Sequence, residues 1–444
     1  MRVLHVTTEF PPIIFGGLGT AVGGLVNACA RGGIDVGVLL VGGVLPGGQN
    51  ACQRYGQAFS PDCRAENSLQ PIIGPEGVPF FQISPYGSVR AASDAATNWG
   101  ADIMHLHTAW VWPFAKAILD NTRIPMIYTV HSVDQAEYEI GQEPEHILGH
   151  SDEQGMAIAQ ADRIIALTRN EGELIEHYYP CAGERIRIIG NGIDDYPIAH
   201  LSSTKTRRQD SDSPLVLYCG RLVERKGIRE FLAAIPRVLQ AVPSARFVLA
   251  GGPPNYTGAQ LEREWLPPCC YPYRNQIHFT GWLSPSQVAE WYCAADIQVV
   301  PSRYEPFGMV VLEGMLYGLA MIAASIGGPA EILQHGQTGL LFPPRNIDAL
   351  AEALLQLLTD HELRRRIGCA AAHEVRRKWL WPHIVGRMRN VYCEVISRKF
   401  GTQTGFTRQT LHQTFEEHEC SSSLTEGALA ECVASEELKR MAWA

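Results

Sequence analysis

The stretch YEPFGMVVLEGMLYG, residues 304–318, places two carboxylates, Glu305 and Glu313, eight positions apart. A helix that begins near Phe307 would rise about 9 Å by Glu313, so one carboxylate would precede the helix and the other would lie inside it. The free backbone N–H groups of the first turn would lie between the two and favour a diphosphate. The pattern predicts a single ligand with a sugar at Glu305, a diphosphate at the helix end and ribose hydroxyls at Glu313.

Glu313 also admits a purely structural interpretation. Apolar residues flank it on both sides, with Val311 and Leu312 before it and Met315 and Leu316 after it, so its carboxylate should be partly buried. A buried carboxylate needs hydrogen-bond donors, which a neighbouring arginine would supply as well as a ligand would. The spacing alone leaves both interpretations open.

The chain around this stretch alternates between short apolar runs and segments with helical periodicity. Each run is rich in β-branched or long aliphatic residues and is too short for a helix. The predicted strands are RVLHVTT, DVGVLLVGG, DIMHLH, PMIYTVH, RIIALT and RIRIIGNG in the first half, and LVLYCGR, ARFVLAGG, IHFTGW, DIQVVPS, AMIAAS and GLLFP in the second. This alternation predicts an α/β protein with two doubly wound, Rossmann-like domains.

A polar segment separates the two series. It has almost no apolar residue after Leu201 and cannot bury a face, which is typical of a linker. Near the end of the chain, Trp379 and Trp381 begin a stretch that we expect to form a helix buried against a neighbour. The predicted organisation is a first domain 1–198, a linker 199–213, a second domain 214–378, a C-terminal helix 379–400 that crosses back to the first domain, and a tail 401–444 of unknown role.

Composition excludes several classes of function. A formal net charge of −9 and a pI near 5.9 remove the long-range attraction that nucleic acid or an anionic membrane would need, so small molecules are the expected partners. No window approaches the roughly 18 uncharged apolar residues that span a bilayer. The amino terminus has no signal-peptide pattern, and we expect a cytoplasmic protein.

The cysteine pattern is consistent with that location. The 12 cysteines form no C-x-x-C pair and are interpreted as reduced thiols. A redox pair of the adjacent Cys269 and Cys270 is the alternative, but their proline-rich setting favours ordinary loop thiols.

The pair Glu305 and Glu313 resembles the E-x7-E motif of retaining GT-B glycosyltransferases, in particular family four, which includes glycogen and sucrose-phosphate synthases. The resemblance extends in matching order from about Met1 to Ile396. It implies two domains facing a cleft and transfer of a sugar from a nucleoside diphosphate donor, with a UDP-sugar as the family-level expectation, to a hydroxyl acceptor. The departing phosphate oxygen would take the acceptor proton on the same face, and no metal ion or other cofactor is implied.

Three further motifs match the family pattern. EFPPIIFGGLGTAV, from residue 9, looks like its glycine-rich loop, although many glycine clusters are only turns. GRLVERKG, from residue 220, matches its phosphate clamp, where Arg221 and Lys226 would neutralise the leaving group; surface charges are the alternative. MIYTVHS ends a strand with His131, which matches the active-site histidine near the sugar and the acceptor.

The resemblance implies a role for each of these residues. His131 and Glu305 would orient the sugar, Arg221 and Lys226 would hold the diphosphate, and Glu313 would hold the ribose. The predicted catalytic residues are His131, Arg221, Lys226 and Glu305, and the predicted donor-binding residues are Gly16, Gly17, Gly19, Arg221, Lys226, Glu305, Phe307, Gly308, Met309 and Glu313.

Two histidines of DIMHLH receive different interpretations. His107 stands at the end of the predicted strand, where a site residue would lie, whereas His105 is favoured as a satisfied core residue. Two histidines on one strand without a third ligand nearby make a poor zinc site, so no metal is predicted.

Two shorter segments also match the family. The glycine of NGID, residues 191–194, is predicted to serve a turn or hinge, and a position of Asn191 in the cleft is less favoured. IGGPAEIL resembles the G-G-x-x-E element, where Gly327 and Gly328 would let backbone approach the ligand. Glu331 fits a helix cap or an ion pair equally well.

Rival functions remain at this point. An epimerase of sugar nucleotides and a non-catalytic sugar-nucleotide sensor would use the same fold. A nicotinamide dehydrogenase is disfavoured, because the first glycine loop is not G-x-G-x-x-G directly after the strand. The donor base, the sugar and the acceptor depend on variable loops, such as residues 43–85 and 253–274.

Overall fold

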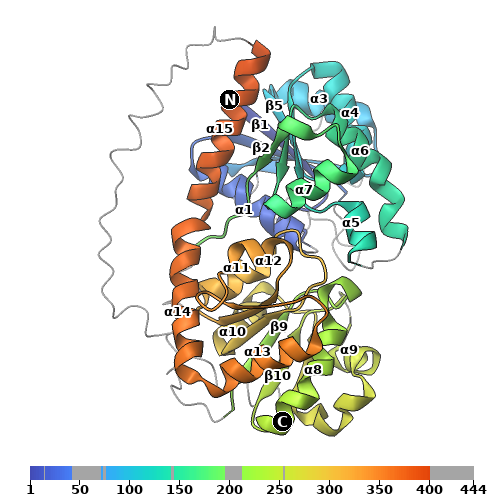
Figure 1. Cartoon of the computed structure of the whole chain (residues 1–444). Helices are drawn as coiled ribbons and strands as arrows, with labels where there is room; N and C mark the ends of the chain where they lie inside the picture. The colour runs from blue at the N-terminus through green and yellow to red at the C-terminus, as the bar shows by residue number, and fades with distance from the viewer. Residues whose placement is uncertain are drawn as a thin grey trace.

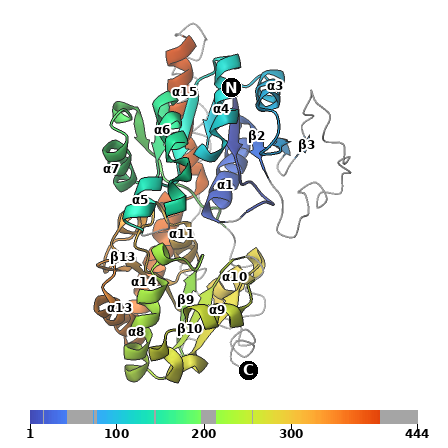
Figure 2. The same cartoon turned by 90° about the vertical axis from the view of Figure 1, so that its right-hand side faces the viewer.

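The computed structural model describes residues 1–14, 16–42, 72–73, 77–141, 145–195, 213–253 and 256–400 of the protein. The predicted linker, apart from Ser213, and the tail 401–444 lie outside these residues. The two α/β domains are stacked one above the other, with α1 and α11 at their junction (Figures 1 and 2). The predicted fold class is confirmed.

The first domain contains an eight-stranded sheet with the order β3-β4-β2-β1-β5-β6-β7-β8. All neighbouring strands are parallel except β3 and β4, which are antiparallel. The strands are β1 (Arg2–Thr7), β2 (Asp35–Val41), β3 (Ile72–Ile73), β4 (Pro79–Ile83), β5 (Ile103–Leu106), β6 (Met126–Val130), β7 (Arg163–Ala166) and β8 (Ile186–Ile188). The helices are α1 (Gly17–Arg31), α3 (Val89–Trp99), α4 (Trp112–Thr122), α5 (Asp134–Glu139), α6 (Ser151–Gln160) and α7 (Arg169–Tyr178).

The second domain contains a six-stranded parallel sheet with the order β11-β10-β9-β12-β13-β14. Its strands are β9 (Leu215–Cys219), β10 (Arg246–Ala250), β11 (Ile277–Gly281), β12 (Ile297–Val300), β13 (Ala320–Ala324) and β14 (Leu340–Phe342). Its helices are α8 (Ile228–Ala241), α9 (Gly258–Trp265), α10 (Pro285–Ala294), α11 (Met309–Leu316), α12 (Gly327–Ile332), α13 (Ile347–Thr359) and α14 (His361–Lys378).

Both faces of the first sheet are buried. Along β1, Val3 packs into the core below α1 and the last helix, α15 (Trp381–Phe400), whereas Leu4 and Val6 pack into the core below α3 and α4. Successive side chains of a strand alternate between the two faces. His5 therefore lies on the same face as Val3, beneath α1 and α15.

The C-terminal helix α15 packs against α1, so the chain returns to the first domain after α14 (Figure 1). Trp381 anchors this return and is only 2% exposed. A Cβ atom at Gly24 would lie 2.4 Å from the Trp381 ring, and one at Gly192 would lie 2.7 Å from it. The glycine of NGID is therefore required by close packing against Trp381, in addition to any role in a turn.

Three local expectations have a clear outcome. The helix expected to begin near Phe307 begins at Met309, because Gly308 with φ 92° precedes it. Cys269 and Cys270 lie in a 3-10 helix, Pro268–Gln276, and not in a loop. The thiol of Cys270 is buried and lies 3.1 Å from the Leu232 carbonyl, which fits an ordinary core thiol. No described helix is long and apolar enough to cross a membrane.

Candidate functional site

Lys226 and Glu305 form an ion pair at the topological switch point of the second sheet. The sheet order reverses between β9 and β12, and these two strands lead into the loops that carry the pair. Lys226 Nζ lies 2.5 Å from Glu305 Oε2, which also accepts a hydrogen bond from Ser302 Oγ at 3.0 Å. Ligands of open α/β sheets bind outside the carboxyl ends of the strands at such a point.

Gly227 fixes the position of Lys226. Its φ of 69° lies in the left-handed region, and a Cβ atom there would lie 1.9 Å from the Pro301 carbonyl oxygen. Only glycine tolerates both conditions. The backbone of Lys226 is thus held directly against the segment that follows β12.

Electrostatics keep the Glu305 carboxylate ionised although it is buried. Burial raises its pKa, but the charges of Lys226 and Arg225 and the hydrogen bonds from Lys226 and Ser302 outweigh burial and place the pKa below its ordinary value. Glu305 Oε1 has no hydrogen-bond partner among the described residues. One carboxylate oxygen is therefore held and the other is available to a ligand.

Arg221 follows β9 directly and is exposed. Burial is the main cause that lowers the pKa of Lys226, and the charges of Arg225 and Arg221 add to it while Glu305 opposes it. The two predicted clamp cations therefore lie close enough to repel each other. An anion between them would relieve that repulsion.

Glu313 is half-buried inside α11 and is held by a tyrosine instead of an arginine. Tyr292 of α10 donates a hydrogen bond to Glu313 Oε2 at 2.7 Å. Burial raises the pKa of Glu313, and this hydrogen bond lowers it by less. Among the described residues no cation pairs with Glu313, so the structural alternative of a Glu–Arg pair is not what the protein contains.

The glycine-rich loop meets α11 across the junction of the domains. A Cβ atom at Gly17 would lie 4.0 Å from Met309 Cγ, which brings the amino-terminal ends of α1 and α11 together. The backbone N–H groups of Gly16 and Gly19 each donate to Glu9 Oε2 at 3.2 Å. These two donors, predicted to approach phosphates, are occupied by a carboxylate of the chain itself.

The loop between β12 and α11 contacts the carboxyl ends of strands in the first sheet. The Tyr304 hydroxyl accepts a hydrogen bond from the backbone N–H of Val133 at 3.0 Å and donates one to Glu171 at 3.0 Å. Thr168 Oγ1 donates to the Pro306 carbonyl at 3.2 Å. Glu305 is thus bracketed by contacts to the segments that follow β6 and β7, and His131 lies two residues before Val133.

The ring of Phe307 is buried in a contact between the domains, and its predicted role in donor binding stays a prediction. Its ring is 2% exposed and packs against Trp379, with ring centroids 5.5 Å apart, and a Cβ atom at Gly190 would lie 2.6 Å from it. The side chain therefore closes the apolar contact between the domains. The sequence motif around Phe307 could not reveal this contact, because Gly190 belongs to the other domain.

The G-G-x-x-E element supports the same loop. Gly327 and Gly328 let α12 pack against the backbone carbonyls of Glu305 and Phe307, where Cβ atoms would lie 2.2 and 1.8 Å from these oxygens. The Glu331 carboxylate accepts the backbone N–H groups of Arg169 and Asn170 at 3.1 and 3.0 Å, at the amino-terminal end of α7. Of its two predicted roles, Glu331 fills that of a helix cap, and it does so across the domains.

His131 follows β6 and lies beside His107, whose Nδ1 is 3.2 Å from His131 Nε2. His105 is fully buried, with its ring nitrogens 2.8 Å from the Tyr392 hydroxyl and 2.7 Å from Thr129 Oγ1, which fits a satisfied core histidine. A cavity with room for about one water molecule adjoins His107, His131 and Asn191.

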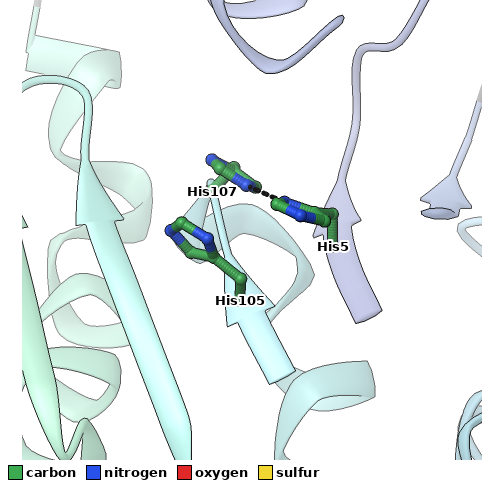
Figure 3. Close-up of side chains that lie close together, drawn as sticks. All are labelled: His5, His105 and His107. Atoms are coloured by element: carbon green, nitrogen blue, oxygen red, sulfur yellow. Dashed lines mark hydrogen bonds between the residues drawn. The ribbon is translucent and has the colours of Figure 1, made fainter. Parts of the chain in front are cut away.

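The prediction that His105 and His107 have no third ligand nearby is wrong. β1 pairs with β5 and places His5 opposite His105, so one ring nitrogen from each of the three histidines lies within 4.8 Å of the others (Figure 3). Five of their six ring nitrogens, however, have hydrogen-bond partners in the protein. The cluster is satisfied as a network of imidazoles.

Sequence reasoning missed Arg225 as well as His5. Arg225 is 6% exposed, and its guanidinium lies 3.4 Å from Glu137 of α5, so it pairs across the domains. The sequence could have pointed to Arg225, because it stands beside Lys226 in GRLVERKG. His5 could have been found from strand alternation only with the strand order already known.

Sequence comparison assigns both domains to glycosyltransferases. Residues 15–196 match the family described as Glycosyltransferase Family 4, and residues 213–360 match the family described as Glycosyl transferases group 1. Together these matches cover most of the chain, which is a glycosyltransferase of the family-four type with the GT-B fold. This confirms the resemblance carried by Glu305 and Glu313.

Several relatives of this glycosyltransferase match most of its length. It is 28% identical to the glycogen synthase of Mycobacterium tuberculosis over 88% of this chain and 94% of that protein. The structure of sucrose-phosphate synthase from Thermosynechococcus elongatus is similar with a TM-score of 0.71 and 23% identity, and covers 90% of this chain and 100% of that one. An Anabaena protein in complex with UDP-glucose is similar with a TM-score of 0.66 and 18% identity, over 89% of this chain and all of that one. The two structures support the fold alone.

Proposed function

We propose that this glycosyltransferase binds a UDP-sugar at the junction of its domains, with the diphosphate on the amino-terminal end of α11. The carrying observation is the Lys226–Glu305 pair, which stands at the switch point beside that helix end. Lys226 and Arg221 hold the diphosphate, the unpartnered Oε1 of Glu305 accepts a sugar hydroxyl, and Glu313 accepts the ribose hydroxyls. The UDP-glucose complex of the Anabaena protein supports the choice of donor for the first assays.

The chemical step follows from these positions. The bond between the sugar C1 and the β-phosphate oxygen breaks, and the acceptor oxygen forms a bond to C1 on the same face. The acceptor proton passes to the departing phosphate oxygen, so no group of the protein needs to act as nucleophile. Arg221, Lys226 and the α11 end stabilise the negative charge that develops on the leaving group.

No metal ion is needed in this scheme. A cation that binds a diphosphate stabilises the leaving group, and in this proposal Arg221 and Lys226 supply that charge. Turnover should therefore persist in excess chelator. Loss of turnover in chelator and recovery with Mg²⁺ would contradict this part of the proposal.

A Lys226→Ala variant tests the proposed function. Removal of one charge-stabilising donor should lower kcat/KM by about 10²- to 10³-fold. Lys116→Ala is the matched control, because Lys116 forms only an exposed i,i+4 pair with Asp120. Substrates are a panel of nucleotide sugars with hydroxyl acceptors, and products are identified by mass spectrometry.

The outcomes separate the hypotheses. Intact turnover in Lys226→Ala would remove the clamp from the mechanism. An epimerised sugar formed from the donor without any acceptor would support the epimerase instead. Donor binding without turnover across the acceptor panel would support a sensor.

A further inference from the structure

Three imidazoles form a continuous hydrogen-bonded chain from the interior of the first sheet to the domain junction. His5 Nδ1 lies 2.9 Å from His107 Nε2, and His107 Nδ1 lies 3.2 Å from His131 Nε2 (Figure 3 shows the first link). The chain begins at His5 Nε2, which is buried and has no hydrogen-bond partner. It ends at His131 Nδ1, which has none among the described residues.

The strand order creates this chain. β1, β5 and β6 are adjacent and parallel, and the register sets His5 opposite His105. Since side chains two positions apart share a face, His107 lies on the same face as His105. The chain thus runs across the switch point of the first sheet, where β1 and β5 meet.

All three imidazoles are neutral near pH 7. Burial lowers the pKa of His5 to about 3 and that of His131 to about 4, and burial is also the main cause that lowers the pKa of His107. A neutral imidazole carries one proton and is a donor at one nitrogen and an acceptor at the other. The three protons of the chain must therefore all point in the same direction.

Neither end has a partner among the described residues, but His5 Nε2 is buried, whereas His131 is partly exposed and adjoins the small cavity. With the proton of His5 on Nε2, a buried N–H would have no acceptor; with the proton on Nδ1, only a lone pair is left without a partner. Orphaned buried N–H donors are the rarer case in proteins. His5 Nδ1–H then donates to His107, His107 Nδ1–H donates to His131, and the proton of His131 is placed on Nδ1.

We propose that His5 and His107 are positioning residues that fix His131 in the Nδ1–H tautomer, so that it presents a hydrogen-bond donor to the ligand. His131 then acts toward an oxygen of the sugar or of the leaving group and cannot accept the acceptor proton. The inference rests on the proposed function only for the identity of that ligand. The tautomer itself is a property of the free protein.

A metal ion is the competing occupant of this cluster. It would need lone pairs from His5, His105 and His107 directed at one point, which requires breaking the His5–His107 link and a bond of His105. The three rings are at most 2% exposed, so bulk water does not reach them as a fourth ligand. The hydrogen-bonded chain needs no rearrangement.

The decisive measurement is the tautomer of His131 in the unaltered protein. Histidine-selective ¹³C and ¹⁵N labelling, with His131→Gln for assignment, reports through the ring shifts which nitrogen carries the proton. We expect Nδ1–H for His5, His107 and His131 throughout the neutral pH range. A proton on Nε2 of His131 would overturn the inference, and so would a stoichiometric metal in the purified protein that is lost with His5.

Two variants of His5 test the positioning role. His5→Leu removes the donor, so His131 should populate the other tautomer and kcat should fall about tenfold with KM little changed. His5→Asn places an amide N–H where Nδ1 stood and should restore the tautomer and most of kcat. Equal ring shifts of His131 in the unaltered protein and in His5→Leu would refute the role.

The readouts separate this inference from the proposed function. If no glycosyl transfer is found, the ring shifts still decide the direction of the chain. If the shifts agree with the inference but His131→Gln has full activity, the catalytic role of His131 is wrong. The direction of the imidazole hydrogen bonds is then still supported.

Discussion

Tyr392→Phe is expected to destabilise the first domain, because the Tyr392 hydroxyl joins α15 to His105 of the histidine cluster. Tyr392 is fully buried, and its hydroxyl lies 2.8 Å from His105 Nδ1. Phenylalanine keeps the ring in place, so the main loss is one hydrogen bond. The His105 nitrogen that made this bond stays buried without a partner. Leaving a buried polar atom unsatisfied costs about 1–3 kcal/mol. For a domain of this size, each kcal/mol of lost stability lowers the midpoint temperature of unfolding by about 2–4 °C, so Tyr392→Phe should lower it by roughly 2–12 °C.

Calorimetry of the full chain measures this fall, with Tyr178→Phe as the matched control. The Tyr178 hydroxyl also makes one hydrogen bond, 2.7 Å to Glu139, but at the surface, where water replaces the carboxylate. The control should leave the midpoint nearly unchanged. Equal midpoints for Tyr392→Phe and the unaltered protein would show that His105 does not depend on α15.

Three other outcomes follow from the structure. Burial raises the pKa of Glu171 to about 8, so the folded protein holds a proton that the unfolded chain releases; stability should fall between about pH 4.5 and 8, and thermal scans of Glu171→Gln should show a flatter pH dependence. Gly227→Ala should lower stability far more than Gly336→Ala in urea unfolding, since both have positive φ but only the first Cβ atom meets backbone, at 1.9 Å from the Pro301 oxygen; equal losses would contradict this. Small-angle scattering should show domain closure when nucleotide is added, whereas identical profiles would argue against it.

The sequence was sufficient to predict the fold and one part of the site. Alternating strands and helices identify both sheets, and residues directly after strands meet at one edge of a parallel sheet. This rule brings Lys226, after β9, to Glu305, after β12, and the structure joins them at 2.5 Å. Lys226 itself was assigned by resemblance to the phosphate clamp and Glu305 by the E-x7-E motif; the properties of doubly wound sheets explain why the two meet.

Contacts between distant segments could not be predicted in the same way. Phe307 lies in the strongest motif of the sequence, yet its ring serves the apolar contact with Gly190 and Trp379. His5 looked like an ordinary strand residue, and its partner lies 102 positions away. Both depend on which strands and domains become neighbours, and periodicity within one segment carries no such information.

The two helix ends at the domain junction differ in what they can offer an anion. At α1, Glu9 already accepts the N–H groups of Gly16 and Gly19, so its charge offsets the positive end of that helix. At α11, the N–H groups of Met309 and Val310 have no acceptor among the described residues. A diphosphate should therefore bind at α11 together with the cations after β9. The glycine loop should let the backbone come close to the ligand and add little positive charge. Under the proposed function, the glycines of the first domain then matter for shape, and the second domain supplies the charge that favours a diphosphate.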